Sequence, residues 1–238
     1  MKTAKAVAVL CIVFSLLVSC NKKSDVKHLS PDEMFEYVQS VIGEEIALVN
    51  VDGEEPDNRI TYIFNIVSRD IDFEVEATKA VHNLNGLRLG NYKLVITIRY
   101  ITGIKQHYRE ESAQLAEKYN VKYNLRNSVS ARITVNSYDD IDKLTDFMIV
   151  LDRLYAFDII KPDAIASLTH NEAIYFDSCS VIAPVYSTDR NKRLNREDLK
   201  EEIIKRYVAA LKSAGRTDIA IPRELLEKYG DYYWNEVT

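Results

Sequence analysis

Cys179 and His170 are the one pair of side chains in this sequence whose chemistry suits nucleophilic catalysis. A cysteine acts as a nucleophile when a nearby base takes its proton, and histidine often serves as that base. Cys179, however, lies in the apolar stretch from Ile174 to Ile182, which is typical of a strand. Free cysteine in such surroundings is usually a small buried hydrophobe. We therefore favour a structural role for Cys179 over a catalytic one.

The other familiar catalytic and cofactor-binding patterns are missing from the sequence. No two of the seven glycines have the spacing of a phosphate-binding loop or a dinucleotide fingerprint. No serine lies in a G-x-S-x-G elbow, and the S-x-x-K match at residues 24–27 lies in a polar segment with nothing to position it. The four histidines are far apart, and the acidic turn at residues 52–57 lacks the alternation of a calcium loop. We expect no nucleotide, no other cofactor and no metal.

A basic cluster is the first of two candidate binding surfaces. It comprises Arg190, Lys192, Arg193 and Arg196, in a polar loop that opens a helix. In an acidic chain, such a cluster can attract an anionic envelope polymer or a protein partner. The alternative, which we favour, is that neighbouring acids such as Glu197 neutralise these charges in an exposed loop.

An aromatic cluster near the C-terminus is the second candidate, and it contains Tyr229, Tyr232, Tyr233 and Trp234. Clustered aromatic side chains stack on sugar rings and dominate many protein interfaces. They equally serve to pack a terminal segment onto the core, and we favour this second role. A glycan or a protein of the cell envelope is the partner that the first role implies.

The first 20 residues have the organisation of an export signal. Lys2 and Lys5 precede Ala6–Val18, a run of 13 residues that are all apolar except Ser15. Such a run is too short to span a bilayer comfortably and is typical of a signal-peptide core. It ends in Leu17-Val18-Ser19-Cys20, which resembles the lipobox of bacterial lipoproteins.

The resemblance implies that the chain is cleaved between Ser19 and Cys20 and that the Cys20 sulfur carries a diacylglycerol. Residues 1–19 would then be removed, residues 20–29 would form a lipidated tether, and residues 30–238 would form a single domain. Two acyl chains anchor a protein more stably than one does. The expected location is extracytoplasmic, on a bacterial membrane that the protein contacts through the lipid on Cys20.

Charge and cysteine content agree with this organisation. The formal net charge is −5, and removal of the signal's two lysines takes it to −7. This balance argues against nucleic acid as a partner, because nucleic-acid binding needs a basic surface. Of the three cysteines, Cys11 leaves with the signal and Cys20 is lipidated, so Cys179 has no partner for an intramolecular disulfide.

Periodicity predicts an α+β fold for residues 30–238. Ser30 begins a helix with a capping-box pattern, and residues 59–77 alternate as a hairpin with one apolar and one polar face. We expect a mostly antiparallel sheet of about five strands with helices packed on one face. The predicted helices are 31–49, 106–123, 137–157, 195–214 and 223–229; the predicted strands are 59–67, 71–77, 92–101 (central in the sheet), 129–136 and 173–182.

The leading functional hypothesis is a non-enzymatic, membrane-tethered domain that binds a partner or ligand. It rests on the lipobox and on the missing catalytic patterns. The alternative is an envelope hydrolase whose catalytic residues are dispersed in the sequence, and a third possibility is a structural envelope component without a ligand. Convergent titratable groups in a pocket would favour the hydrolase, whereas an exposed aromatic patch would favour binding.

Overall fold

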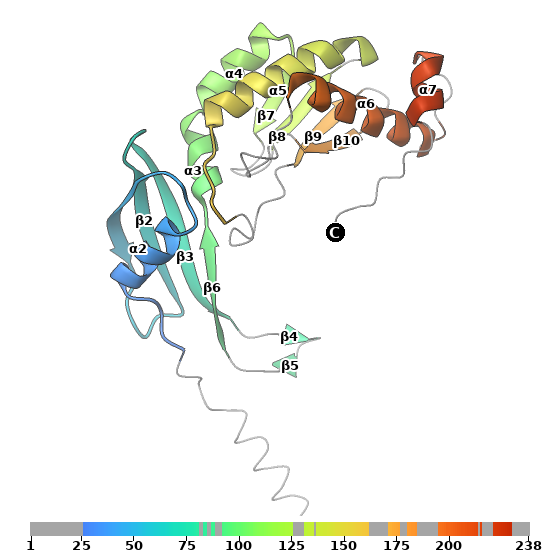
Figure 1. Cartoon of the computed structure of the whole chain (residues 1–238). Coiled ribbons are helices and arrows are strands. Elements are labelled where there is room, and N and C mark those ends of the chain that lie inside the picture. The colour runs from blue at the N-terminus through green and yellow to red at the C-terminus, as the bar shows by residue number, and fades with distance from the viewer. Residues whose placement is uncertain are drawn as a thin grey trace, which may run out of the picture.

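The fold is α+β, as the sequence predicts, and a computed structural model provides its details (Figure 1). The structure describes residues 26–80, 83–84, 87–88, 92–125, 131–135, 137–161, 171–176, 180–184, 195–213, 215 and 221–229. The strands form two four-stranded sheets and one two-stranded pair, where a single sheet of about five strands was expected.

The first sheet is antiparallel, with the order β1-β2-β3-β6. Its strands are β1 (Ile46–Asp52), β2 (Arg59–Ile66), β3 (Ile71–Ala80) and β6 (Lys93–Ile98). The predicted hairpin is confirmed as β2 and β3, with apolar residues buried on one face and polar residues on the other. The short strands β4 (Asn83–Leu84) and β5 (Leu87–Arg88) pair with each other between β3 and β6.

Helix α2 (Pro31–Gln39) lies against the first sheet (Figure 1). The capping box at its start is confirmed, because Ser30 and Glu33 hydrogen-bond reciprocally. The helix ends ten residues before the predicted end at 49, and the second half of that prediction is wrong. The apolar residues after Gln39 make tertiary pairs instead: Ile42 bridges to Ile159, and Ile46 begins β1.

The second sheet has the order β10-β9-β8-β7, in which β8 and β9 are parallel and the other neighbours antiparallel. Its strands are β7 (Lys122–Leu125), β8 (Ala131–Val135), β9 (Asn171–Phe176) and β10 (Ser180–Pro184), so the single strand predicted at 173–182 is a strand pair. Figure 1 shows the helices of this half together on one side of the sheet. They are α4 (Arg109–Lys118), α5 (Ile141–Tyr155), α6 (Arg196–Ser213) and α7 (Arg223–Tyr229), with a 3-10 turn, η1 (Tyr138–Asp140), before α5.

Helix α3 (Tyr100–His107) connects the two sheets. Strand β6 was expected to be central and to reach residue 101, but it is an edge strand and ends at Ile98 because the chain turns into α3. Tyr100, the first residue of α3, is fully buried; its hydroxyl donates to the Glu44 carboxylate and accepts from the backbone N–H of Asp158 at 3.0 Å. Burial, together with the hydrogen bond to Glu44, raises the pKa of Tyr100 above its usual value. Buried apolar residues of both sheets form one continuous cluster.

Within the described residues, none of the helices combines the length and the apolar composition that crossing a bilayer requires.

Candidate functional site

Most of the site residues proposed from sequence lie outside the described residues, and their predictions remain predictions. The lipidation site, the basic loop, the aromatic tail and the cysteine–histidine pair all belong to this group: Cys20, Arg190, Lys192, Arg193, Tyr232, Tyr233, Trp234, Cys179 and His170. Two members of these clusters, Arg196 and Tyr229, are described.

Arg196 is neutralised by acids of its own half of the molecule. Its guanidinium pairs with Asp146 at 2.6 Å, with Glu197 at 2.8 Å and with Asp142 at 3.1 Å. Lys200, one turn further along α6, pairs with the same Asp142 at 2.7 Å. These contacts hold α6 against α5. The contacts that the structure describes for Arg196 therefore give it a structural role.

Tyr229 packs the end of α7 onto α6. The side chain is buried, and its hydroxyl donates to Glu201 Oε1 at 2.6 Å. The ammonium groups of Lys228 and Lys205 lie 4.8 and 5.8 Å from the ring centre, within the range of cation–π attraction. The hydrogen bond from Tyr229, followed by the charges of the two lysines, lowers the pKa of Glu201. For Tyr229, the packing role fits better than the binding role.

An N-terminal clamp fixes the chain where the predicted tether meets the first sheet. We use this name for His28, Leu29, Glu55, Tyr62 and Lys79. One carboxylate oxygen of Glu55 accepts from the His28 backbone N–H at 2.8 Å and lies 3.0 Å from Nδ1 of the His28 ring. The second carboxylate oxygen of Glu55 pairs with Lys79 at 2.5 Å. The Tyr62 hydroxyl donates to the Leu29 carbonyl oxygen at 2.5 Å. The bond from the His28 backbone, then that from Lys79, lowers the pKa of Glu55 to about 2.

A pocket lies between β3 and α3, at the point where β6 stops pairing with β3. The pairing of β6 with β3 ends with a hydrogen bond from the Arg99 backbone N–H to the Glu74 carbonyl oxygen at 2.8 Å. Beyond it, α3 runs beside the first half of β3. Gly103 allows this close approach, because a Cβ there would lie 2.6 Å from the Asp72 carbonyl oxygen and 2.8 Å from the Phe73 Cβ.

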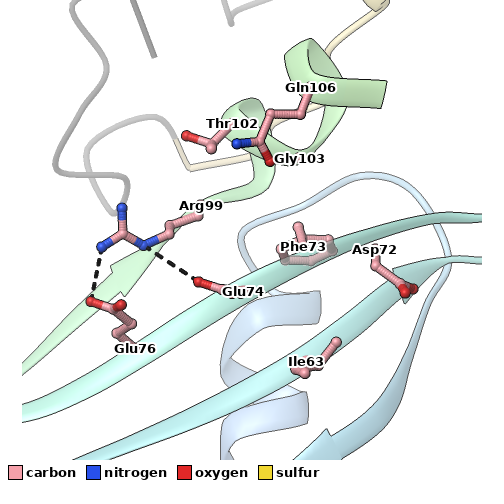
Figure 2. Close-up of a pocket in the computed structure, with 9 residues that line it drawn as sticks. All are labelled: Ile63, Asp72, Phe73, Glu74, Glu76, Arg99, Thr102, Gly103 and Gln106. Carbon is pink, nitrogen blue, oxygen red and sulfur yellow. Dashed lines mark hydrogen bonds and ion pairs between the residues drawn. The ribbon is translucent and has the colours of Figure 1, made fainter. Parts of the chain in front are cut away.

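This β3–α3 pocket has a volume of about 400 Å³, within the usual range for small-ligand sites. Figure 2 shows α3 residues on one wall and β3 residues on the other, with the Arg99 side chain between the two. The lining residues are Ile63, Asp72, Phe73, Glu74, Glu76, Arg99, Thr102, Gly103 and Gln106.

Two guanidinium groups engage Glu76, the most buried acid of the pocket. Its side chain is 13% exposed; one carboxylate oxygen pairs with Arg59, and the other accepts from Arg99 Nη2 at 3.0 Å. Charge-assisted bonds of this kind are the stronger hydrogen bonds in proteins. Both oxygens of Glu76 are therefore committed within the protein.

Asp72 and Glu74 retain most of their capacity to bind a ligand. Glu74 is 54% exposed, and its nearest cation among the described residues, Arg99 Nε, lies 3.9 Å away. That Nε is buried and makes no hydrogen bond to any described group. Asp72 accepts from the Asn65 amide at 2.8 Å, and no ion pair within 4 Å joins it to the rest of the described chain. Asp72 and Glu74 therefore both line the pocket, but their carboxylates are turned in different directions (Figure 2).

The arrangement suits recognition better than proton transfer. The glycosidase reaction uses two carboxyl groups about 5–9.5 Å apart, and strand spacing alone places the side chains of Glu74 and Glu76 about 7 Å apart. The general acid of such a pair lies in apolar surroundings, whereas Glu76 lies between two cations and Glu74 is largely solvated. Among the described lining residues, Thr102 carries the one hydroxyl group.

No cluster of three or more His, Cys, Asp or Glu side chains among the described residues is arranged to hold a metal ion. The acids of the β3–α3 pocket are spaced along one strand, and Arg99 lies beside two of them, Glu74 and Glu76 (Figure 2).

Sequence reasoning missed this pocket, although it predicted the polar hairpin face that carries its acids. Alternating acids at Asp72, Glu74 and Glu76 indicate only a polar sheet face, which is ordinary for a hairpin. The missed element was α3, because residues 99–101 were assigned to a strand. Gly103 is the residue that could have indicated the close contact of α3. A glycine between Tyr100 and His107 is costly in a helix, so its presence there suggests that another segment approaches closely.

Comparisons with protein-family models, with curated proteins and with solved structures gave no match to this chain.

Proposed function

We propose that this chain is a lipid-anchored extracytoplasmic protein that binds a ligand or partner in its β3–α3 pocket without acting as an enzyme. The observation that supports binding is the pair of available carboxylates, Asp72 and Glu74, in a pocket of about 400 Å³. The sequence Leu17-Val18-Ser19-Cys20 supports the anchor. The N-terminal clamp adds to this, since it attaches the chain firmly to the first sheet only eight residues after Cys20.

Metabolic labelling with palmitate in a bacterial host tests the anchor. The full-length chain should take up label and partition into the detergent phase. Cys20→Ala should lose the label and appear in the aqueous phase as a folded protein, because the lipid on Cys20 is the membrane attachment that we propose. Cys179→Ala is the matched control and should keep both label and partitioning. Label that persists in Cys20→Ala would refute the lipoprotein assignment.

A ligand screen tests the binding role separately from the anchor. We expect compounds that raise the melting temperature of the purified full-length protein, and we expect Asp72→Asn and Glu74→Gln to abolish those shifts. Glu36→Gln makes the same charge change on the exposed side of α2 and should bind normally. Each bound compound is then recovered and weighed by mass spectrometry. Recovery of the intact ligand supports binding alone, whereas turnover that requires Glu74 would favour the envelope hydrolase.

A further inference from the structure

The β4–β5 hairpin, by which we mean the paired strands Asn83–Leu84 and Leu87–Arg88, lies at the end of the first sheet that carries the N-terminal clamp. Lys79 of the clamp is the second-last residue of β3, and β4 begins four residues after it. Figure 1 shows β4 and β5 at the lower ends of β3 and β6, whereas α3 begins at the upper end of β6. The hairpin and the clamp therefore share one end of the sheet.

The short tether keeps this end of the sheet close to the bilayer. Only eight residues separate Cys20, the proposed lipidation site, from His28, which the clamp holds. Strand β3 alone has ten residues, and an extended tether gains about the same length per residue as a strand does. The tether is therefore too short for the first sheet to stand inverted, with its clamp end farthest from the membrane.

The residue types of the β4–β5 hairpin suit the interfacial region of a bilayer. The register places Leu84 opposite Leu87 and Asn83 opposite Arg88, so an apolar pair lies next to a pair with one cation. Apolar residues enter the boundary between lipid headgroups and acyl chains, and arginine binds phosphate oxygens well. Among the described elements, β4 and β5 make their main contacts with each other. The hairpin therefore has the position and the composition for contact with lipid.

The charges around the hairpin permit such a contact. Lys27 and Lys93 are exposed at this end of the sheet, and Arg88 lies in β5. Glu55, the acid nearest to the clamp, is already paired with Lys79. Two further acids of the β1–β2 turn offset part of the attraction that these cations have for anionic headgroups. The contact therefore depends mainly on the leucine pair.

We propose that the β4–β5 hairpin is a second, weak contact with the lipid bilayer. Leu84 and Leu87 enter the interfacial region, and Arg88 binds headgroup phosphate. Two leucines are too few to hold a protein on a membrane by themselves. The hairpin therefore orients the domain, and the lipid on Cys20 attaches it.

This orientation keeps the β3–α3 pocket away from the lipid. Asp72, which lines the pocket, lies about 24 Å along β3 from Lys79, which lies beside the hairpin. The inference rests on the proposed lipid anchor and goes beyond it, because it names the surface that faces the membrane.

Fluorescence quenching by brominated lipids tests the inference on the lipidated protein. The vesicles contain phosphatidylethanolamine and phosphatidylglycerol in equal parts, with bromine on the acyl chains close to the headgroups. Trp234, the chain's one tryptophan, is replaced by Phe, so that a single introduced tryptophan reports. Leu87→Trp places this reporter in the hairpin. Val67→Trp is the matched control, since Val67 is 49% exposed in the β2–β3 turn at the opposite end of the same sheet. The lipid should quench the reporter at position 87 and leave the one at position 67 unquenched.

A second pair of variants, both made in the Leu87→Trp reporter protein, tests the leucine pair. Leu84→Ser removes the remaining leucine of the pair and should lower the quenching about twofold. Leu226→Ser changes an exposed leucine of α7 and should leave the quenching unchanged. The comparison of positions 87 and 67 decides the matter even if Leu84→Ser does not fold.

Palmitate labelling of the same samples separates this inference from the anchor on which it rests. In labelled protein, equal quenching at positions 87 and 67, or none at position 87, overturns the hairpin contact and leaves the lipid anchor standing. Protein that takes up no label refutes the anchor, and the hairpin contact falls with it.

Discussion

Arg69 donates from Nη1 to the carbonyl oxygen of Tyr155 at 2.6 Å, and this bond joins the β2–β3 turn to the end of α5. Nη2 makes a matching bond to Ala156 at 2.6 Å, and Nε pairs with Glu44 at 2.8 Å. The last carbonyl groups of a helix lack partners within the helix, and its C-terminal end favours a positive charge. Arg69 satisfies both needs and thereby ties the first sheet to the second half of the molecule.

We expect Arg69→Ala to lower the free energy of unfolding by about 3 kcal/mol, because it removes one partner of a largely buried ion pair and leaves Glu44 without its cation. Urea denaturation of the purified protein measures this change.

The matched control is Arg223→Ala, which removes a 90% exposed arginine paired with Glu227 one turn along α7. An exposed pair of this kind contributes about 0.5 kcal/mol or less. Equal effects of the two substitutions would show that Arg69 does not join the two halves.

Gly103→Ala tests the close contact that forms the β3–α3 pocket. In an open helix this change would stabilise by up to about 1 kcal/mol. Here the added methyl group meets the Asp72 carbonyl oxygen, and overpacking of this kind costs about 1–3 kcal/mol. We therefore predict a net loss of stability and a displaced α3, measured by thermal unfolding and by amide chemical shifts along β3. A stabilised variant would mean that α3 moves away from β3 easily.

Glu55 makes the stability of the N-terminal clamp depend on pH. Its folded-state pKa, about 2, lies below its ordinary value of 4.5. Its contribution is therefore present in full above about pH 4.5 and is lost as the pH falls through about 2. Glu55→Gln should be less stable than the natural chain at neutral pH, and the difference should shrink on acidification over this range. Denaturation curves between pH 2 and 7 measure it, and Glu54→Gln, an exposed neighbour, should show no such pattern.

Tyr229→Phe tests the packing of α7 on α6. Without the hydroxyl, the pKa of Glu201 should rise toward its ordinary value, although Lys205 and Lys228 will keep part of the effect. NMR titration of Glu201 measures this change, and hydrogen exchange should become faster in α7. Leu226→Ala, which changes an exposed residue of the same helix, should leave the Glu201 pKa unchanged. An unchanged Glu201 pKa in Tyr229→Phe would show that the hydrogen bond between Tyr229 and Glu201 does not hold α7 on α6.

Local signals predicted the beginnings of elements better than their ends. The capping box at Ser30 located the start of α2, and Arg223–Tyr229 was predicted with the bounds that the structure has. The end of α2 was missed because Ile42 and Ile46 continue the helical spacing, yet the structure pairs them with segments distant in sequence. The pairing of one strand with another is not contained in the periodicity of either.

The same limitation explains the two sheets. Residues 92–101 are rich in β-branched and aromatic residues, which favours a central strand. The position of β6 at an edge follows from the turn at Arg99 and from the packing of Tyr100 on Glu44, and neither contact has a local pattern. The β3–α3 pocket depends on that turn, so a search for motifs had no means of finding it.

The N-terminal clamp sets how far the protein can reach. From Cys20 to His28 a fully extended chain measures about 29 Å at most. If Cys20 carries the lipid as we propose, the first sheet begins within that radius of the bilayer. The protein then searches for its ligand mainly by lateral diffusion over a thin layer of the envelope. Molecules that remain farther from the membrane would meet it rarely, whatever their affinity for the pocket.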